Sequence, residues 1–187
     1  MRVLGISGSL RRDSHNTRLL RAAGELFEAE GAEFEIYEGL KEVPPYDEDD
    51  DVGGGPEAVA RLRAAVAGAD ALFFSTPEYN SSIPGQLKNA IDWLSRPLAT
   101  NVLRNKPVAV VGASSGMFGA VWAQAELRKV LAAMGARVAE VEVAVGHATE
   151  KFDDEGLLLD DLVRRELADA LATLHAEVRP PLAAAAA

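Results

Sequence analysis

The sequence predicts an α/β protein in which a five-stranded parallel sheet is covered by helices on both faces. Segments with the hydrophobic period of a strand alternate with segments of helical period along the chain, a pattern typical of parallel strands joined by helical crossovers. Three of the predicted strands are continuously apolar, and two alternate between polar and apolar residues. The continuous strands should be buried on both faces, and the alternating strands should lie at the edges of the sheet.

The chain order of these strands indicates the topology. The continuous strands are predicted at 2–7, 70–75 and 107–112, and the alternating strands at 33–38 and 137–143. Among the common doubly wound sheets, the order 2-1-3-4-5 places the second and fifth strands at the edges. The sequence therefore predicts the flavodoxin-like arrangement, a three-layer sandwich.

Five helices are expected between and after these strands, each with one apolar face. They are predicted at 15–30, at 56–68, from Pro84 or Gly85 to the residues before Pro97, between the loop 113–119 and Gly135, and from Asp160 or Asp161 onward. Lys88 and Asp92 should form an i,i+4 ion pair on the third of these helices.

Composition and charge narrow the possible function classes. The 187 residues fit one domain, expected to span 1–178, with 179–187 as a frayed tail because prolines interrupt the last helix. The formal net charge of -10 argues against nucleic acid and anionic membrane surfaces as partners. No segment has the pattern of a signal peptide or membrane span, so we expect a cytoplasmic protein without membrane insertion.

No metal site is predicted. The chain has no cysteine, which excludes cysteine-ligated metals and thiol catalysis. The acidic run 47–51 has Val52 and Ala58 where an EF-hand requires glycine and glutamate. A solvated charge run therefore explains it better.

Three loops should meet at the carboxyl ends of the strands, where open parallel sheets bind ligands. They are 8–16, 76–82 and 113–119, and all are built of small or hydrogen-bonding residues. The first, continued to Thr17, combines a small-residue turn, hydroxyl side chains, Arg11 and Arg12 with a helix N-terminus, which together favour a phosphate. Helix capping by Ser14 or Asn16 is an alternative explanation, and the two roles are compatible.

The same loops resemble a known family. Gly8-Ser9-Leu10-Arg11 with Ser14 and Asn16, followed by the long segment from Pro77-Glu78-Tyr79-Asn80 to Trp93, is similar to the NAD(P)H-dependent FMN reductases, which include quinone, chromate and azo-dye reductases. The motifs run from Val3 to Gly119. The third loop departs from the family at Gly119-Ala120, where members often carry paired glycines.

This resemblance implies a non-covalently bound FMN and specific contacts to it. The phosphate would contact Ser9, Arg11, Ser14, Asn16 and Thr17; the ring and ribityl chain would contact Pro77, Glu78, Tyr79 and Asn80; and Ser115, Gly116 and Gly119 would close the site. Tyr79 and Phe118 either shape the stacking face or pack their loops.

The chemistry implied by the resemblance needs no catalytic side chain, because the flavin carries it. Hydride would pass from NAD(P)H to FMN and then to an acceptor such as a quinone, a free flavin, an azo compound or a metal oxyanion, with ping-pong kinetics. The resemblance also implies a homodimer or homotetramer. Trp93 would either pack across the interface or lie in the core.

Two other functions fit parts of the sequence. Gly112-Ala113-Ser114-Ser115-Gly116 matches the G-x-S-x-G nucleophile elbow of a serine hydrolase, with Ser114 as nucleophile. A flavodoxin-type electron carrier would share the fold and cofactor, and its acidic surface would suit a basic redox partner. A phospho-receiver domain fits less well, because Ser75-Thr76 stands where its acceptor aspartate should be.

Overall fold

The computed structural model describes residues 1–178 as alternating strands and helices, and the predicted tail, 179–187, lies outside the described residues. The strands are β1 (Arg2–Ser7), β2 (Glu33–Ile36), β3 (Ala71–Thr76), β4 (Pro107–Ala113), β5 (Arg137–Val138) and β6 (Ala144–Val145). The α-helices are α1 (His15–Ala29), α2 (Glu57–Gly68), α3 (Gly85–Leu94), α4 (Val121–Ala133) and α5 (Asp161–Val178). Three short 3-10 helices lie at Gly39–Glu42, Glu48–Asp50 and Ala148–Glu150.

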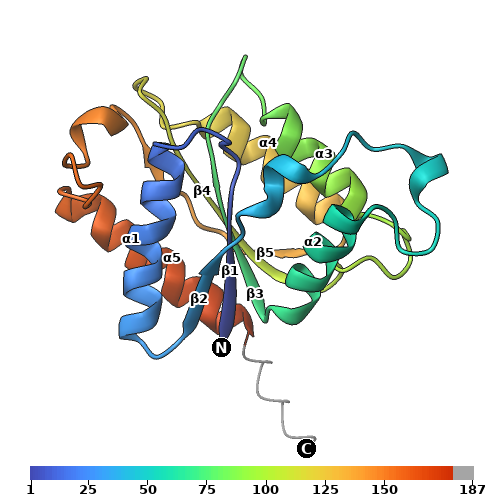
Figure 1. Cartoon of the computed structure of the whole chain (residues 1–187). Helices are drawn as coiled ribbons and strands as arrows, with labels where there is room; N and C mark the ends of the chain where they lie inside the picture. Colours follow the sequence, from blue (N-terminus) through green and yellow to red (C-terminus); the bar gives the residue numbers. More distant parts are fainter. Residues whose placement is uncertain (179–187) are drawn as a thin grey trace, which may run out of the picture.

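The sheet confirms the predicted topology. Its order is β2-β1-β3-β4-β5, with all pairs parallel. In the centre, Leu4 lies opposite Leu72, and Leu72 lies opposite Val108. Because parallel strands share one direction, the loops that follow β1, β3 and β4 leave the sheet at the same end, the upper end in Figure 1.

The prediction of one continuous fifth strand at 137–143 is wrong. β5 ends at Val138, and the two-residue strand β6 returns to pair with the last residues of β4. Between them the Val141 N–H donates to the carbonyl of Ala139, and Arg128 of α4 donates to the carbonyl of Val141. These contacts turn the backbone away from β4, because the groups a ladder would use are already bonded.

Two apolar layers enclose the sheet (Figure 1), with α1 and α5 on one face and α2, α3 and α4 on the other. Alternate residues of the buried strands point to opposite layers: Phe74 packs with α2 and α3, and Phe73 packs edge-to-face on Phe27 of α1. The edge strand β2 alternates as predicted, because Glu33 and Glu35 are exposed.

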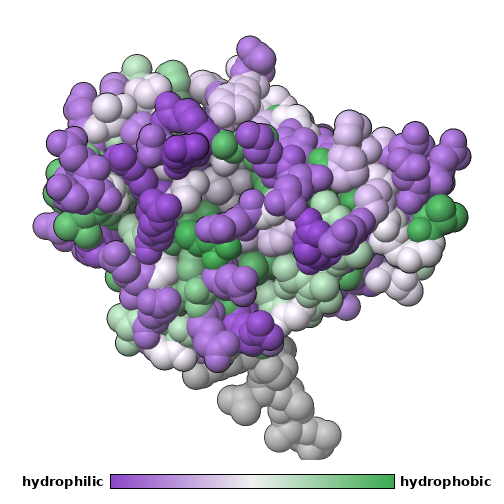
Figure 2. Space-filling model, viewed as in Figure 1, coloured by the Kyte–Doolittle hydropathy of each residue, from purple (hydrophilic) through white to green (hydrophobic). Residues whose placement is uncertain are grey.

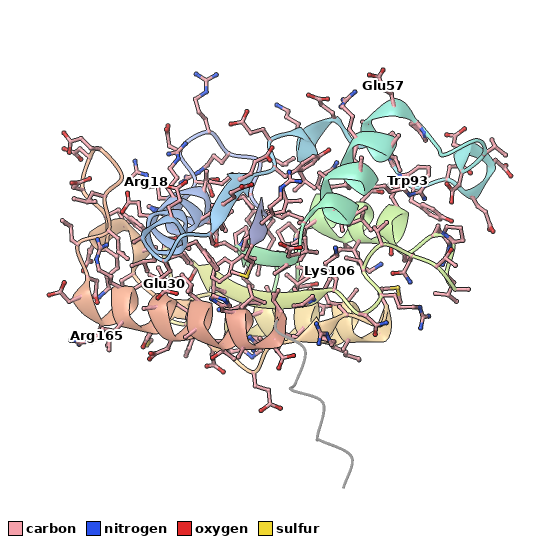
Figure 3. All side chains as sticks on the ribbon, turned by 90° about the horizontal axis from the view of Figure 1, so that it is seen from below. Arg18, Glu30, Glu57, Trp93, Lys106 and Arg165 are labelled. Carbon is pink, nitrogen blue, oxygen red and sulfur yellow. The ribbon has the colours of Figure 1, made fainter. Side chains whose placement is uncertain are left out.

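Trp93 belongs to the core. On α3 (labelled in Figure 3) its side chain has an exposed fraction of 0%, and its indole N–H donates to the carbonyl of Pro44 at 2.9 Å. Arg63 of α2 donates to the Trp93 carbonyl. Of the two sequence-based alternatives, burial is therefore correct, and Trp93 is not available to an interface.

The helix ends follow the local sequence. Ser14 caps α1, since its hydroxyl accepts the Asn16 N–H, and Asp160 caps α5 by accepting the N–H groups of Leu162 and Val163. The predicted pair of Lys88 and Asp92 is present on α3.

The face shown in Figure 2 is mostly hydrophilic with smaller apolar areas. Within residues 1–178, no helix has the length and apolarity to cross a membrane.

Candidate functional site

The three predicted loops enclose a hollow of about 400 Å³ at the carboxyl ends of β1, β3 and β4. Its lining includes eight of the residues expected to contact a cofactor: Ser9, Arg11, Ser14, Asn16, Pro77, Glu78, Tyr79 and Ser115. Four further residues complete it: His15, Ala113, Ser114 and Thr149. The volume lies in the range of small-molecule and cofactor sites.

The first loop presents hydrogen-bond donors to this hollow. Ser14 caps α1 as described, and the N–H groups of the first helical turn beside it point out of the helix end. The Arg11 guanidinium donates one bond to the carbonyl of Asp13 at 2.8 Å, which folds the exposed arginine back over the loop. Two neutral hydroxyls, a guanidinium and a helix N-terminus therefore face one volume, a donor set suited to a phosphate.

Thr17 lies beneath the first loop and is absent from the lining of the hollow. Its hydroxyl bonds to the hydroxyl of Ser7 at 3.1 Å, and the Ser7 hydroxyl contacts the backbone of Ser9. The Thr17 side chain therefore braces the loop against the end of β1.

Asn16 is also braced by the fold. Its side-chain amide bonds to Ser75 of β3 and to the backbone of Ala113 of β4, and the residue has an exposed fraction of only 2%. Sequence analysis identified the residue but not these partners.

The second loop is a tight turn anchored on α4. Tyr79 and Ser82 exchange backbone hydrogen bonds, while Asn80 and Ser81 have φ angles of 54° and 60°. Positive φ at both central positions is typical of a type I′ turn. Asn80 therefore lies at the tip of the turn, and it is not among the residues that line the hollow.

A carboxylate attaches this loop to the start of α4. Glu78 accepts the backbone N–H groups of Trp122 and Ala123, each at 3.1 Å. The residue at the N-cap position of α4, Ala120, offers no side-chain acceptor. Glu78 thus caps a helix distant in sequence, and its carboxylate accepts hydrogen bonds at the positive end of that helix.

The third loop rests on a fourth loop that sequence analysis missed, residues 144–149. Backbone bonds join Ser114 to Val145 and Gly116 to His147. A Cβ on Gly119 would lie 2.3 Å from the Ala144 carbonyl carbon, and one on Gly146 would lie 2.2 Å from the Met117 oxygen. The two glycines allow the backbones to touch, and Gly116 and Gly119 lie outside the lining itself.

The fourth loop brings Thr149 into the hollow. The signal available in the sequence was Gly146-His147 after a short apolar pair, which marks a turn but not its position.

Charge is distributed unevenly around the hollow. Burial, followed by the charges of Arg11 and Arg18, lowers the pKa of His15, whose ring stacks on Phe152. Positive groups therefore gather at the first loop, although the whole chain carries a net charge of -10. This local field suits an anionic group at that end of the site.

Ser114 does not have the surroundings of a hydrolase nucleophile. Its hydroxyl donates to the carbonyl of Gly116 at 3.2 Å, and no hydrogen bond within residues 1–178 joins it to a histidine. A serine nucleophile requires an adjacent general base. The geometry therefore gives no support to the hydrolase alternative.

Comparison with known proteins identifies the family. The family model described as NADPH-dependent FMN reductase matches residues 1–150. The chain belongs to this family. It is an oxidoreductase whose cofactor is FMN and whose reductant is NAD(P)H. The donor set of the first loop fits the phosphate of such a cofactor, and the family membership decides against an electron carrier.

Individual relatives agree over nearly the whole chain. An NAD(P)H-dependent FMN reductase from Pseudomonas aeruginosa is 43% identical over 96% of this chain and 96% of its own. A quinone reductase from Pseudomonas putida is 39% identical over 84% of each chain. The solved structure of FerB, a flavoenzyme NAD(P)H:(acceptor) oxidoreductase from Paracoccus denitrificans, superposes with a TM-score of 0.84 at 32% identity, covering 94% of this chain and 98% of that one.

Proposed function

We propose that this oxidoreductase passes electrons from NAD(P)H to a quinone, with FMN held in the hollow between the loops that follow β1, β3 and β4. The observation that carries the proposal is the donor set of the first loop, which joins Ser9, Arg11 and Ser14 to the N-terminus of α1 on one wall of the hollow. The quinone reductases among the relatives support this class of acceptor. Free flavins, azo compounds and metal oxyanions are further candidate acceptors.

Each loop has its own part in this proposal. Ser9, Arg11, Ser14, Asn16 and Thr17 form the phosphate end of the site. Pro77, Glu78, Tyr79 and Asn80 form the border of the ring and ribityl chain, and Ser115, Gly116 and Gly119 form the closing wall. Thr17, Asn80, Gly116 and Gly119 act through the backbone they shape, because their side chains or Cα atoms do not line the hollow.

When bound, FMN supplies the redox chemistry by taking a hydride from NAD(P)H and reducing the acceptor. The chain then has to bind and orient the FMN and to leave one side of it open to the acceptor. Tyr79 and Phe118 have exposed fractions of 52% and 55%, and Phe118 packs edge-to-face on Trp122. These aromatic side chains are suited to contact a planar acceptor.

Arg11 gives the first test. Arg11→Ala removes a charge from the proposed phosphate end, so the dissociation constant of FMN should rise by about tenfold, as expected for loss of a charge-assisted hydrogen bond. Riboflavin, which lacks the phosphate, should bind both proteins alike. Arg12→Ala is the control, because Arg12 is exposed and does not line the hollow. Flavin fluorescence quenching measures the dissociation constants of the wild type, Arg11→Ala and Arg12→Ala. If Arg11→Ala lost equal affinity for FMN and for riboflavin, the assignment would be contradicted.

Steady-state kinetics test the acceptor. With a benzoquinone as acceptor, double-reciprocal plots of the initial rate at several NADH or NADPH concentrations should give parallel lines. The reason is that the oxidised nicotinamide leaves before the quinone binds. Intersecting lines would indicate that both substrates bind at the same time and would contradict the expected ping-pong kinetics.

Three proposals concern the whole chain. The domain spans 1–178, the protein is cytoplasmic, and it forms a homodimer or homotetramer. With Trp93 buried, the exposed apolar side chains Met117, Phe118 and Trp122 beside the hollow are better candidates for a subunit contact than α3. Light scattering coupled to size-exclusion chromatography measures the mass of the assembly. A monomer at micromolar concentration would refute the proposed homodimer or homotetramer.

A further inference from the structure

We propose that Asn16 is a positioning residue whose buried amide holds the ends of β3 and β4 against the first turn of α1, and that this contact sets the shape of the FMN site. The inference rests on the proposed function, because it takes the hollow lined by these elements as the cofactor site. It assigns the Asn16 side chain to the junction of the three loops, where its polar atoms are already bonded.

The hydrogen bonds of Asn16 reach two strands. Its Oδ1 accepts the Ser75 hydroxyl at 2.8 Å and the Ala113 N–H at 3.0 Å, and its Nδ2 donates to the Ala113 carbonyl at 2.9 Å. The backbone N–H of Asn16 is occupied as well, because it donates to the Ser14 hydroxyl. One side chain therefore connects the helix that follows the first loop with the strands that precede the second and third loops.

Burial makes these bonds costly to lose. Asn16, Ser75 and Ala113 have exposed fractions of 2%, 0% and 1%. Water cannot replace a lost partner at such positions without a rearrangement, and a buried polar group left unpaired costs far more than an exposed one. A change at Asn16 should therefore move the elements relative to one another.

This arrangement requires one donor and one acceptor at position 16. Ala113 presents both its N–H and its carbonyl to position 16, so the side chain must accept at one atom and donate at the other. An ionised aspartate accepts at both oxygens and would face the Ala113 carbonyl with a negative charge. A protonated aspartic acid has one donor and one acceptor and reproduces the pattern of the amide.

This difference makes Asn16→Asp a pH-dependent test. Burial and the facing carbonyl both raise the pKa of the introduced carboxyl group, so acid should restore the missing donor. At pH 8 the dissociation constant of FMN should exceed that of the wild type by about tenfold or more, and at pH 5.5 the ratio should fall below about threefold. The titration follows flavin fluorescence in the full-length protein.

The effects of other charged and titratable groups near position 16 have to cancel. Arg11, His15 and Glu78 line the hollow together with Asn16, Arg18 lies two residues after Asn16 on α1, and the FMN phosphate itself changes charge near pH 6. All of these groups are present in both the wild type and Asn16→Asp. The ratio of the variant's dissociation constant to that of the wild type therefore reports the effect of position 16 alone. Asn16→Ala should show a raised ratio that does not depend on pH.

Asn101 offers a matched control. It has an exposed fraction of 4%, its amide donates to the carbonyls of Leu98 and Met134, and its Oδ1 accepts the Leu103 N–H. It precedes β4, at the end of the sheet opposite the hollow. Asn101→Asp should lower the free energy of unfolding, measured with urea, while leaving the dissociation constant of FMN within about twofold of the wild type.

The outcomes separate the two proposals. If the wild type binds no FMN in this assay, the proposed function fails. If the wild type binds FMN and Asn16→Asp loses stability with unchanged affinity, as Asn101→Asp should, Asn16 is structural only and the inference is overturned. Should Asn16→Asp not fold, Ser75→Ala removes a single donor to Oδ1 and should weaken FMN binding by about threefold. Unchanged affinity of Ser75→Ala would then refute the inference.

Discussion

Gly119 shows how one missing Cβ permits a loop contact that shapes the site. Its φ is 56°, and a Cβ would overlap the backbone of Ala144. Gly119→Ala should therefore lower the free energy of unfolding by at least about 2 kcal/mol, through the left-handed backbone and the overlap together. Gly85→Ala is the control, because nothing lies within 4 Å of its added Cβ. Urea denaturation measures both, and an equal stability of the two variants would contradict the contact.

His15 should make stability depend on pH. Its pKa in the folded protein is lowered, so below about pH 6.5 the unfolded chain binds a proton that the folded chain does not. The free energy of unfolding of the FMN-free protein should fall as the pH decreases from 8 to 5.5, and His15→Gln should reduce this fall. Arg11→Ala should act in the same direction but less, because Arg11 is only one cause of the shift. An identical slope in the wild type and His15→Gln would refute the assignment.

At individual positions, the sequence identified residue types better than partners. Ser14 as a cap and the donors of the first loop could be predicted, since capping depends on neighbouring residues. The contact of Asn16 with Ala113 joins positions 97 apart and has no local signature. Likewise, Glu78 carries no sign in the sequence that its carboxylate caps α4.

The loop 77–83 and α4 are joined by two carboxylates in opposite directions. Glu78 of the loop accepts N–H groups of α4, and Glu126 of α4 accepts the Ser82 hydroxyl at 2.6 Å. Glu78→Ala should lower the free energy of unfolding by about 1 kcal/mol, as the loss of a helix cap does. Glu126→Ala should lower it by a similar amount. The double variant should lose less than the sum, because release of one contact frees the loop and weakens the other.

The controls for this pair are simple. Glu25 is exposed in the middle of α1, so Glu25→Ala should change the free energy of unfolding by less than about 0.5 kcal/mol. All four variants are compared by urea denaturation of the same preparation. Strictly additive losses from Glu78→Ala and Glu126→Ala would show that the two contacts act independently.

Among the elements, those with strong periodicity were predictable and those decided by side-chain contacts were not. Continuous apolar runs predicted β1, β3 and β4 because a strand buried on both faces is mostly apolar along its length. The alternation at 137–143 has the period of an edge strand, yet Arg128 binds the Val141 carbonyl and the strand is divided. The hydrophobic period of a sequence gives no sign of such a contact, so the fourth loop, residues 144–149, could not be predicted either.

We expect the two apolar layers to unfold as one cooperative unit in the domain proposed at 1–178, because the buried strands contribute side chains to both layers. Leu62 lies in the layer of α2 and α3, and Leu167 of α5 lies in the other; both are almost fully buried. Leu62→Ala and Leu167→Ala should each lower the free energy of unfolding by about 2–5 kcal/mol. Their distance across the sheet makes the two losses additive.

The tryptophans make this cooperativity measurable. Trp93 is buried in the layer of α2 and α3, and Trp122 lies on α4 of the same side, so their fluorescence reports on one layer, whereas far-ultraviolet circular dichroism reports on all helices. In Leu167→Ala, the fluorescence midpoint in urea should decrease as much as the dichroism midpoint, although the substitution is in the opposite layer. A fluorescence midpoint that stays at the wild-type value would mean that the layers unfold separately, and the cofactor site would then span two independent units.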